Sequence, residues 1–241
     1  MRLIINADDF GLSKSISDGI VEGIKKGYIT STTVMANMPY AEYAINQAIE
    51  NNINCIGLHI NLTVGKPIIK NDNLTDNNGV FYYNKSQIEN KNLTYEDAYN
   101  EIIAQIEKIN EYSKGKIKID HLDAHHFLVQ NNEIIKKAAI EVANKLNIPL
   151  RNEGVSEVKC PDVLYTNFTI ENVNVKAIRN MISLYKDKNM VVELAVHPGY
   201  IDEYTKTITS YIGREKELKV LKEAKEKGFF NGIELINFSQ F

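Results

Sequence analysis

The sequence predicts an α/β fold, a single-domain β/α barrel of distorted, TIM-like form covering residues 1–241. Short apolar runs alternate with longer amphipathic segments, which is the pattern of parallel βαβ units. About seven such units fit in one chain of 241 residues, and a closed or nearly closed barrel accommodates them better than an open sheet. An open, doubly wound sheet is the alternative.

Composition excludes several classes of protein. Hydrophobic residues make up 44% and charged residues 24%, the formal net charge is −3, and basic residues form no block, so we expect no nucleic-acid partner. Cys55 and Cys160 are far apart and have no metal-type spacing, which is typical of reduced thiols. No signal peptide or membrane-spanning run is apparent, so we expect no membrane partner and a cytoplasmic protein.

The first half of the chain starts with a strand at 3–7 and a helix that begins at a capping pattern in 15–18. Isoleucines recur every four residues in this helix, which should end near Gly27. A long segment at 63–92, rich in Gly, Asn and Asp, breaks the alternation and is typical of a functional loop. The other elements expected here are a strand at 32–38, a helix at 40–51 and a strand at 53–60.

The second half restarts with a helix at Thr94. The 190–196 run is the clearest buried strand of the chain, and 155–170 is irregular. A second long loop is expected at 199–212. The remaining predicted elements are strands at 117–122, 148–151 and 232–236, and helices over 135–146, 171–186 and 214–227.

The chemically capable side chains fall at the ends of predicted strands. Because parallel strands in a barrel end at one face, residues distant in sequence should converge there. All five histidines belong to this set, although each residue alone could be a core, cap or turn residue. The set comprises Asp8, Asp9, His59, His121, Asp123, His125, His126, Arg151 and His197.

One carboxylate and two neutral imidazoles are a common ligand set for a divalent ion. Such an ion would also explain the adjacent pair Asp8-Asp9, because its charge would stabilise one carboxylate while the other acts on a water molecule. A separate histidine could protonate the leaving group. The pattern indicates metal-assisted hydrolysis and leaves open which bond is cleaved and which metal is used.

Five motifs resemble those of the YdjC-like carbohydrate deacetylases, which include the chitooligosaccharide deacetylases. In chain order they are NADDFG, STTVMANM, GLHINLTVGKP, HLDAHHF and VHPGY, between residues 6 and 200. The resemblance implies a β/α barrel similar to that of polysaccharide deacetylases. It also implies divalent-metal-dependent removal of acetyl groups from N-acetylated sugars or oligosaccharides.

Matched by position, the resemblance implies that the metal ligands are Asp9, His59 and His125. It further implies that Asp8 is the catalytic base and that His197 is the general acid.

Arg151, Asp123 and His126 are candidates for binding the substrate or supporting these groups. The chain departs from the family pattern at Phe127, where a third histidine is usual, so its supporting hydrogen bonds or substrate preference could differ.

The expected cofactor is one divalent ion, with Mg²⁺ favoured over Zn²⁺, and the expected partner is a small N-acetylated sugar or oligosaccharide. A homodimer is a weak expectation from the family. Two other functions remain open at this point: a different metal-dependent hydrolase, such as a phosphoesterase or an amidase, and a non-catalytic sugar-binding barrel.

Overall fold

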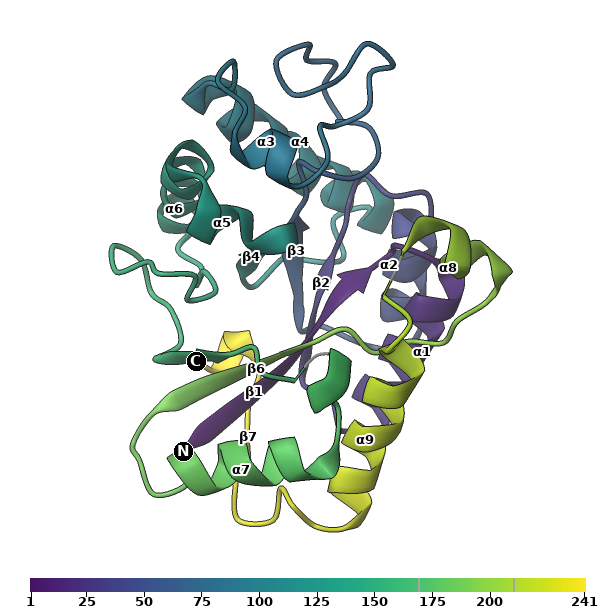
Figure 1. Ribbon diagram of the computed structural model, residues 1–241, viewed down its shortest axis with the longest axis vertical. Coiled ribbons are helices and arrows are strands. Elements are labelled where there is room, and N and C mark those ends of the chain that lie inside the picture. Colours follow the sequence, from purple (N-terminus) through teal and green to yellow (C-terminus); the bar gives the residue numbers. More distant parts are fainter. Residues whose placement is uncertain (169, 210) are drawn as a thin grey trace.

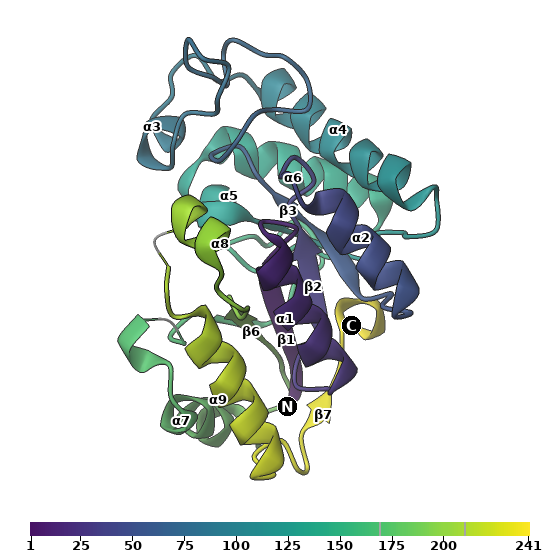
Figure 2. The same ribbon diagram turned by 90° about the vertical axis from the view of Figure 1, so that its right-hand side faces the viewer.

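A curved, parallel β-sheet forms the centre of the molecule, and helices cover its outside (Figures 1 and 2). The structure is a computed structural model and describes residues 1–168, 170–209 and 211–241. The strand order is β4-β3-β2-β1-β6-β5, and β7 also pairs with β1. Every described pairing is parallel, so the predicted distorted barrel is confirmed, in the form of a half-barrel.

The strands place their carboxyl ends at one edge of the half-barrel. β1 is central, and it pairs with β6 along six residues from Arg2 to Ala7. The strand bounds are β1 (Arg2–Phe10), β2 (Ser31–Val34), β3 (Ile56–Ile60), β4 (Leu122–Ala124), β5 (Val163–Tyr165), β6 (Val191–Val196) and β7 (Glu234–Leu235).

The helices form the outer layer, in which α4 packs beside α6 and α7 beside α9. The 61–94 segment, with the short α3, forms the top of the molecule in both views (Figures 1 and 2). The helix bounds are α1 (Lys14–Lys25), α2 (Ala41–Glu50), α3 (Lys85–Ile88), α4 (Tyr95–Ser113), α5 (Leu128–Asn131), α6 (Glu133–Leu146), α7 (Val175–Tyr185), α8 (Glu203–Ile208) and α9 (Arg214–Glu226), with 3₁₀ turns η1 (His125–Phe127), η2 (Ile170–Asn172) and η3 (Phe238–Gln240).

A β-bulge in β1 determines how the adjacent aspartates point. Phe10 comes three positions after Ala7, but their partners in β2, Thr32 and Val34, are only two positions apart, so β1 carries one extra residue. Asp9 within this bulge has a φ of 67°, in the left-handed region that few side chains adopt. Successive side chains in a regular strand point to opposite faces, and the bulge re-aims them. Both carboxylates can therefore face the same end of the sheet.

Several predicted boundaries were wrong. Asp8 and Asp9 lie inside β1 and do not follow it, because the strand continues through the bulge. The N-cap of α1 is Ser13, whose hydroxyl accepts from the Ile16 backbone, so the expected capping pattern at 15–18 is not the one used. The capping box that begins α4 at Thr94 is present.

The sheet differs from the prediction on the side of β4 and β5. The strand predicted at 117–122 is shorter and begins later along the chain; it is β4. The 148–151 strand is reduced to an isolated bridge between Leu150 and Leu122, while β5 lies in the 155–170 stretch that was predicted to be irregular. In the described part of the chain, no helix is long and apolar enough to cross a membrane.

Candidate active site

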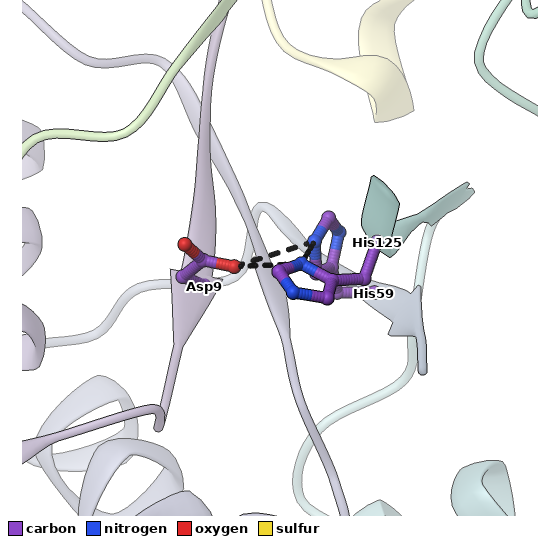
Figure 3. Close-up of side chains that lie close together, drawn as sticks. All are labelled: Asp9, His59 and His125. Atoms are coloured by element: carbon purple, nitrogen blue, oxygen red, sulfur yellow. Dashed lines mark hydrogen bonds and ion pairs between the residues drawn. The ribbon is translucent and has the colours of Figure 1, made fainter. Parts of the chain in front are cut away.

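Three potential metal ligands converge at the carboxyl ends of β1, β3 and β4 (Figure 3). Asp9 Oδ1 lies 3.4 Å from His59 Nε2 and 3.2 Å from His125 Nδ1, and the two nitrogens are 3.2 Å apart. Asp9 Oδ1 is buried and makes no well-aligned hydrogen bond with any residue that the structure describes. A buried carboxylate oxygen that faces two imidazole nitrogens is the arrangement expected of three ligands that share one ion.

The spacing of these three atoms fits a first-row or magnesium ion. Bonds of about 2.1 Å place neighbouring ligand atoms about 3.0 Å apart in an octahedron and about 3.4 Å apart in a tetrahedron. The three observed distances, 3.2 to 3.4 Å, lie between these limits. Oxygen and imidazole ligands suit both Mg²⁺ and Zn²⁺, so the donor set fits a divalent ion without identifying it.

Asp123 determines which nitrogen of His59 faces the other two ligands. The Asp123 carboxylate lies 2.7 Å from His59 Nδ1, and a carboxylate only accepts, so Nδ1 donates and the neutral ring has its lone pair on Nε2. The other Asp123 oxygen accepts from the Thr33 hydroxyl at 2.9 Å. Hydrogen-bonding a ligand histidine through its second nitrogen is how proteins orient metal ligands. Asp123 therefore supports His59.

Neighbouring charges and burial shift the pKa values of the ligand candidates in opposite directions. Burial disfavours the ionised Asp9, but the Arg214 guanidinium and the histidines hold the pKa of Asp9 well below its usual range. Burial lowers the pKa of His59, yet the Asp123, Asp9 and Asp8 carboxylates raise it well above the usual value. A proton would therefore compete with a metal ion for Nε2 of His59.

Asp8 forms a two-fold hydrogen-bonded pair with Arg151. Both terminal nitrogens of Arg151 donate to the Asp8 carboxylate at 2.7 Å, and the Asn6 side chain donates to Oδ1 at 2.9 Å. Arg151 also bonds Glu193 through Nε and approaches Asp123 to 2.9 Å. Burial raises the pKa of Asp8, but the Arg151 charge and hydrogen bonds outweigh it and hold that pKa well below its usual range. Asp8 is thus kept ionised.

His197 follows β6 and lies beside Asp8, with 3.8 Å between its Nε2 and Asp8 Oδ2. Its backbone N–H donates to the Glu217 carboxylate at 2.5 Å. Burial lowers the pKa of His197, although the Asp8 and Asp9 carboxylates oppose this shift. Gly199, in the same turn, lies so close to α1 that a Cβ there would be 2.9 Å from Ile16 Cα, which fixes the path of the chain after His197.

Two charged residues of α9 belong to the site and were missed in the sequence. Arg214 Nη2 donates to Asp9 Oδ2 at 2.7 Å, and Glu217 holds the His197 backbone. Burial raises the pKa of Glu217 to about 8. The 214–227 helix was predicted, but its charges are typical of a solvated face and carry no signal of burial. The i, i+3 spacing of Arg214 and Glu217 on one face was the only hint.

Two neighbours of the ligands have an unusual backbone. His126 and Phe127 have φ values of 57° and 52°, both left-handed. The His126 ring lies 3.9 Å, centroid to centroid, from that of His125, and its Nδ1 is 3.0 Å from the Thr63 hydroxyl. Burial, with the neighbouring His125, lowers the pKa of His126 to about 3, so this ring is neutral.

Two hollows meet at the histidines. The larger has a volume of about 360 Å³ and holds Asp9, and the smaller, of about 220 Å³, holds Asp8 and Arg151. Both are lined by His125, His126 and His197. The two aspartates thus face different hollows. The larger one is also lined by Leu12, Val64, Tyr83, Ile208, Thr209, Tyr211 and Arg214.

All eight candidate site residues from the sequence lie in this cluster, and the convergence at the strand ends is as expected. The remaining histidine, His121, does not reach the ligands. It precedes β4, stacks on Phe238 and contacts the Asn6 side chain from below the site.

The sequence matches the family model described as YdjC-like protein over residues 2–231. A carbohydrate deacetylase from Clostridium beijerinckii is 38% identical, with 99% of each chain covered. A carbohydrate deacetylase from Listeria monocytogenes is 34% identical, again with 99% of each chain covered.

Solved structures share the fold. A protein from Enterococcus faecalis V583, described as a candidate cellobiose-phosphate cleavage protein, has a TM-score of 0.90 at 30% identity, covering 99% of this chain and 98% of that one. The peptidoglycan deacetylase PdaC from Bacillus subtilis has a TM-score of 0.53 at 13% identity, covering 99% of this chain and 88% of that one. At that identity the second likeness concerns the fold alone.

Proposed function

The chain belongs to the YdjC-like family, and we propose that residues 1–241 form one metal-dependent carbohydrate N-deacetylase that releases acetate and a free amino sugar. The observation that carries the proposal is the buried, unpartnered Asp9 Oδ1 atom, 3.2 and 3.4 Å from two imidazole nitrogens. The names of the curated relatives support the reaction, since they are carbohydrate deacetylases.

Asp9, His59 and His125 would hold one divalent ion, which we take to be Mg²⁺, with Zn²⁺ as the alternative. A divalent ion bound there would acidify a water molecule and stabilise the charge that develops on the acetamide oxygen. The Asp8 carboxylate accepts the proton of the attacking water, because Arg151 keeps it ionised and Oδ2 faces His197. The water oxygen forms a bond to the acetamide carbon as the carbon–nitrogen bond breaks.

His197 donates a proton from Nε2 to the departing nitrogen, so that the amine leaves neutral. Its place supports this role, because it lines both hollows and lies beside Asp8. Arg151 orients Asp8, Asp123 orients His59, and His126 forms part of the wall next to His125. A substrate bound in the larger hollow would therefore meet two of the proposed ligands, Asp9 and His125, and the proton donor His197.

The larger hollow fits a small sugar. Its volume of about 360 Å³ and its mixture of apolar and aromatic walls are typical of small-molecule sites. Tyr83 is exposed and lies edge-on to His126, where its ring is available to a sugar face. The prediction of a loop over 199–212 was wrong in part, because this segment contains α8. Within it, Tyr200 donates to Glu22, and Tyr204 of α8 packs on Tyr40.

Phosphate-ester hydrolysis is the competing reaction, since the Enterococcus relative is described with a phosphorylated disaccharide. Among the described residues that line the larger hollow, the one arginine is Arg214, and Asp9 already binds it. Among the described residues of this wall, no further arginine or lysine stands beside the proposed divalent ion to hold a phosphate, which favours a neutral acetamide. The complete ligand and base set argues against a binding protein without catalysis.

Acetate release tests the proposal directly. The protein is treated with chelator, reloaded with Mg²⁺ or Zn²⁺, and given N-acetylglucosamine and its short β-linked oligomers, with and without a 6-phosphate. We expect metal-dependent acetate release and no inorganic phosphate. Phosphate release without acetate, or full activity after metal removal, would overturn it.

A further inference from the structure

Arg214 is a buried cation that contacts one oxygen of a metal-ligand candidate. It is the first residue of α9 and is 2% exposed. Its Nη2 donates to Asp9 Oδ2 at 2.7 Å, its Nη1 reaches the His197 carbonyl at 3.4 Å, and its Nε has no described partner. Burying a guanidinium is unfavourable unless a charge compensates it, and Asp9 is the carboxylate that does so.

The two buried arginines of the site hold their aspartates differently. Arg151 takes both oxygens of Asp8, the arrangement that arginine and carboxylate favour as a simple ion pair. Arg214 takes only Oδ2 of Asp9. The second oxygen, Oδ1, is left facing the two histidines without a hydrogen bond. The contrast indicates a function for the free oxygen beyond neutralising a charge.

The backbone of Asp9 gives its side chain a direction that needs support. Its φ of 67° belongs to a bulged strand and lies in the left-handed region, which residues with a Cβ seldom adopt. A carboxylate can still rotate about its last bond, since that torsion is broad. Arg214 donates to Oδ2 alone, while Oδ1 faces the two histidines.

The first turn of α9 reaches the proton donor as well. Glu217, one turn after Arg214, accepts the His197 N–H at 2.5 Å, and the Gly199 N–H donates to the Arg214 carbonyl at 3.3 Å. One helix end therefore contacts both the ligand carboxylate on β1 and the turn after β6.

We infer that Arg214 is a positioning residue that fixes Oδ1 of Asp9 toward His59 and His125, and that it thereby sets the affinity of the site for a divalent ion. The inference rests on the proposed function, because it takes these three residues as the ligands. Loss of a group that orients a ligand typically lowers metal affinity 10- to 100-fold.

The test measures Zn²⁺ binding to the metal-free full chain by isothermal titration calorimetry. The variants are Arg214→Met, which keeps the length and removes the donor, and Arg214→Gln, which keeps a polar end. Arg214→Lys keeps the charge and one donor. Lys219→Met is the matched control, since it removes a cation from an exposed position of the same helix. Thermal unfolding without metal shows which variants are folded.

We expect at least a tenfold weaker Zn²⁺ affinity in Arg214→Met and Arg214→Gln, an intermediate value in Arg214→Lys, and no change in Lys219→Met. A folded Arg214→Met or Arg214→Gln protein with wild-type affinity would overturn the inference. Unfolding of both neutral variants would also overturn it, because Arg214 would then be required for the stability of the fold.

The proposed function can fail separately. A wild-type protein that binds Zn²⁺ but releases no acetate would contradict the proposed reaction and leave the Arg214 result standing. A wild-type protein that binds neither Zn²⁺ nor Mg²⁺ would overturn both.

Discussion

Arg151 and Asp8 are joined by two hydrogen bonds of 2.7 Å, which reach both carboxylate oxygens. The pair is almost completely buried, and Arg151 also contacts Asp123 and Glu193. It favours the ionised form of the proposed base, and it has consequences for activity and for stability.

Replacing Arg151 should change the pH dependence of the reaction. Without the guanidinium, burial is the largest remaining influence on Asp8, so its pKa rises. In Arg151→Met we expect the acidic limb of kcat/KM to move to higher pH, because the base must be ionised. Arg151→Lys keeps the charge but loses the two-pronged geometry, and should show a smaller shift. A variant with an unshifted limb would contradict the pairing of Arg151 with the base.

The same pair links stability to pH. The pKa of Asp8 is lower in the folded protein than in the unfolded chain. Ionised Asp8 therefore contributes to the free energy of unfolding above its unfolded pKa near 3.8, and this contribution is lost as pH falls through its folded pKa. Breaking a buried pair leaves an uncompensated charge, which costs about 3–5 kcal/mol. Urea unfolding at pH 7 should show Arg151→Met destabilised by about this amount. An unchanged free energy of unfolding would show that the pair contributes little.

Asp123 should matter for metal binding although it is not proposed as a ligand. Its bond to His59 Nδ1 selects the tautomer that leaves Nε2 free. In Asp123→Asn we expect a 10- to 100-fold weaker Zn²⁺ affinity by calorimetry. Thr33→Val removes a hydroxyl that donates to the other oxygen of Asp123 and lies 3.3 Å from His59 Nδ1, but it leaves the Asp123–His59 bond in place and should have a smaller effect. Equal losses in the two variants would contradict the tautomer explanation.

His197 can be tested through the leaving group. An amine needs a proton to depart, whereas a nitrophenolate does not, so His197→Ala should slow N-acetyl hydrolysis by about 10²–10⁴-fold and affect 4-nitrophenyl acetate far less. Burial lowers the pKa of His197, so its acid form is lost, as pH rises, earlier than that of an ordinary histidine. We therefore expect the wild-type rate to fall as pH rises, and the variant to lack that limb. Equal slowing of both substrates would point to a structural role.

The parts of the fold that the sequence predicts well depend on local signals. The Thr94–Asp97 capping box begins α4 where expected, and the apolar run at 190–196 matches β6. The prediction of a strand near Leu150 was wrong, because the pairing there reduces to one bridge. β5 was missed because it is only three residues long and half-buried. Whether so short a run becomes a strand depends on its neighbours in space.

The candidate site shows the same division. His59, His125 and Asp9 could be found because each residue follows or ends an apolar run. Arg214 could not, since a charged residue in a highly charged helix is usually solvated, and its burial depends on contacts with Asp9 of β1 and with the turn after β6. The bulge that turns both aspartates to one end is likewise a property of strand pairing.

The central claim is that the adjacent aspartates have different roles, and matched substitutions test it most directly. Zn²⁺ affinity and acetate release are measured in parallel for Asp8→Asn and Asp9→Asn. We predict that Asp8→Asn binds Zn²⁺ but loses acetate release by about 10²–10⁴-fold, and that Asp9→Asn loses both. Near-normal acetate release by Asp8→Asn, or wild-type Zn²⁺ affinity in Asp9→Asn, would contradict the account.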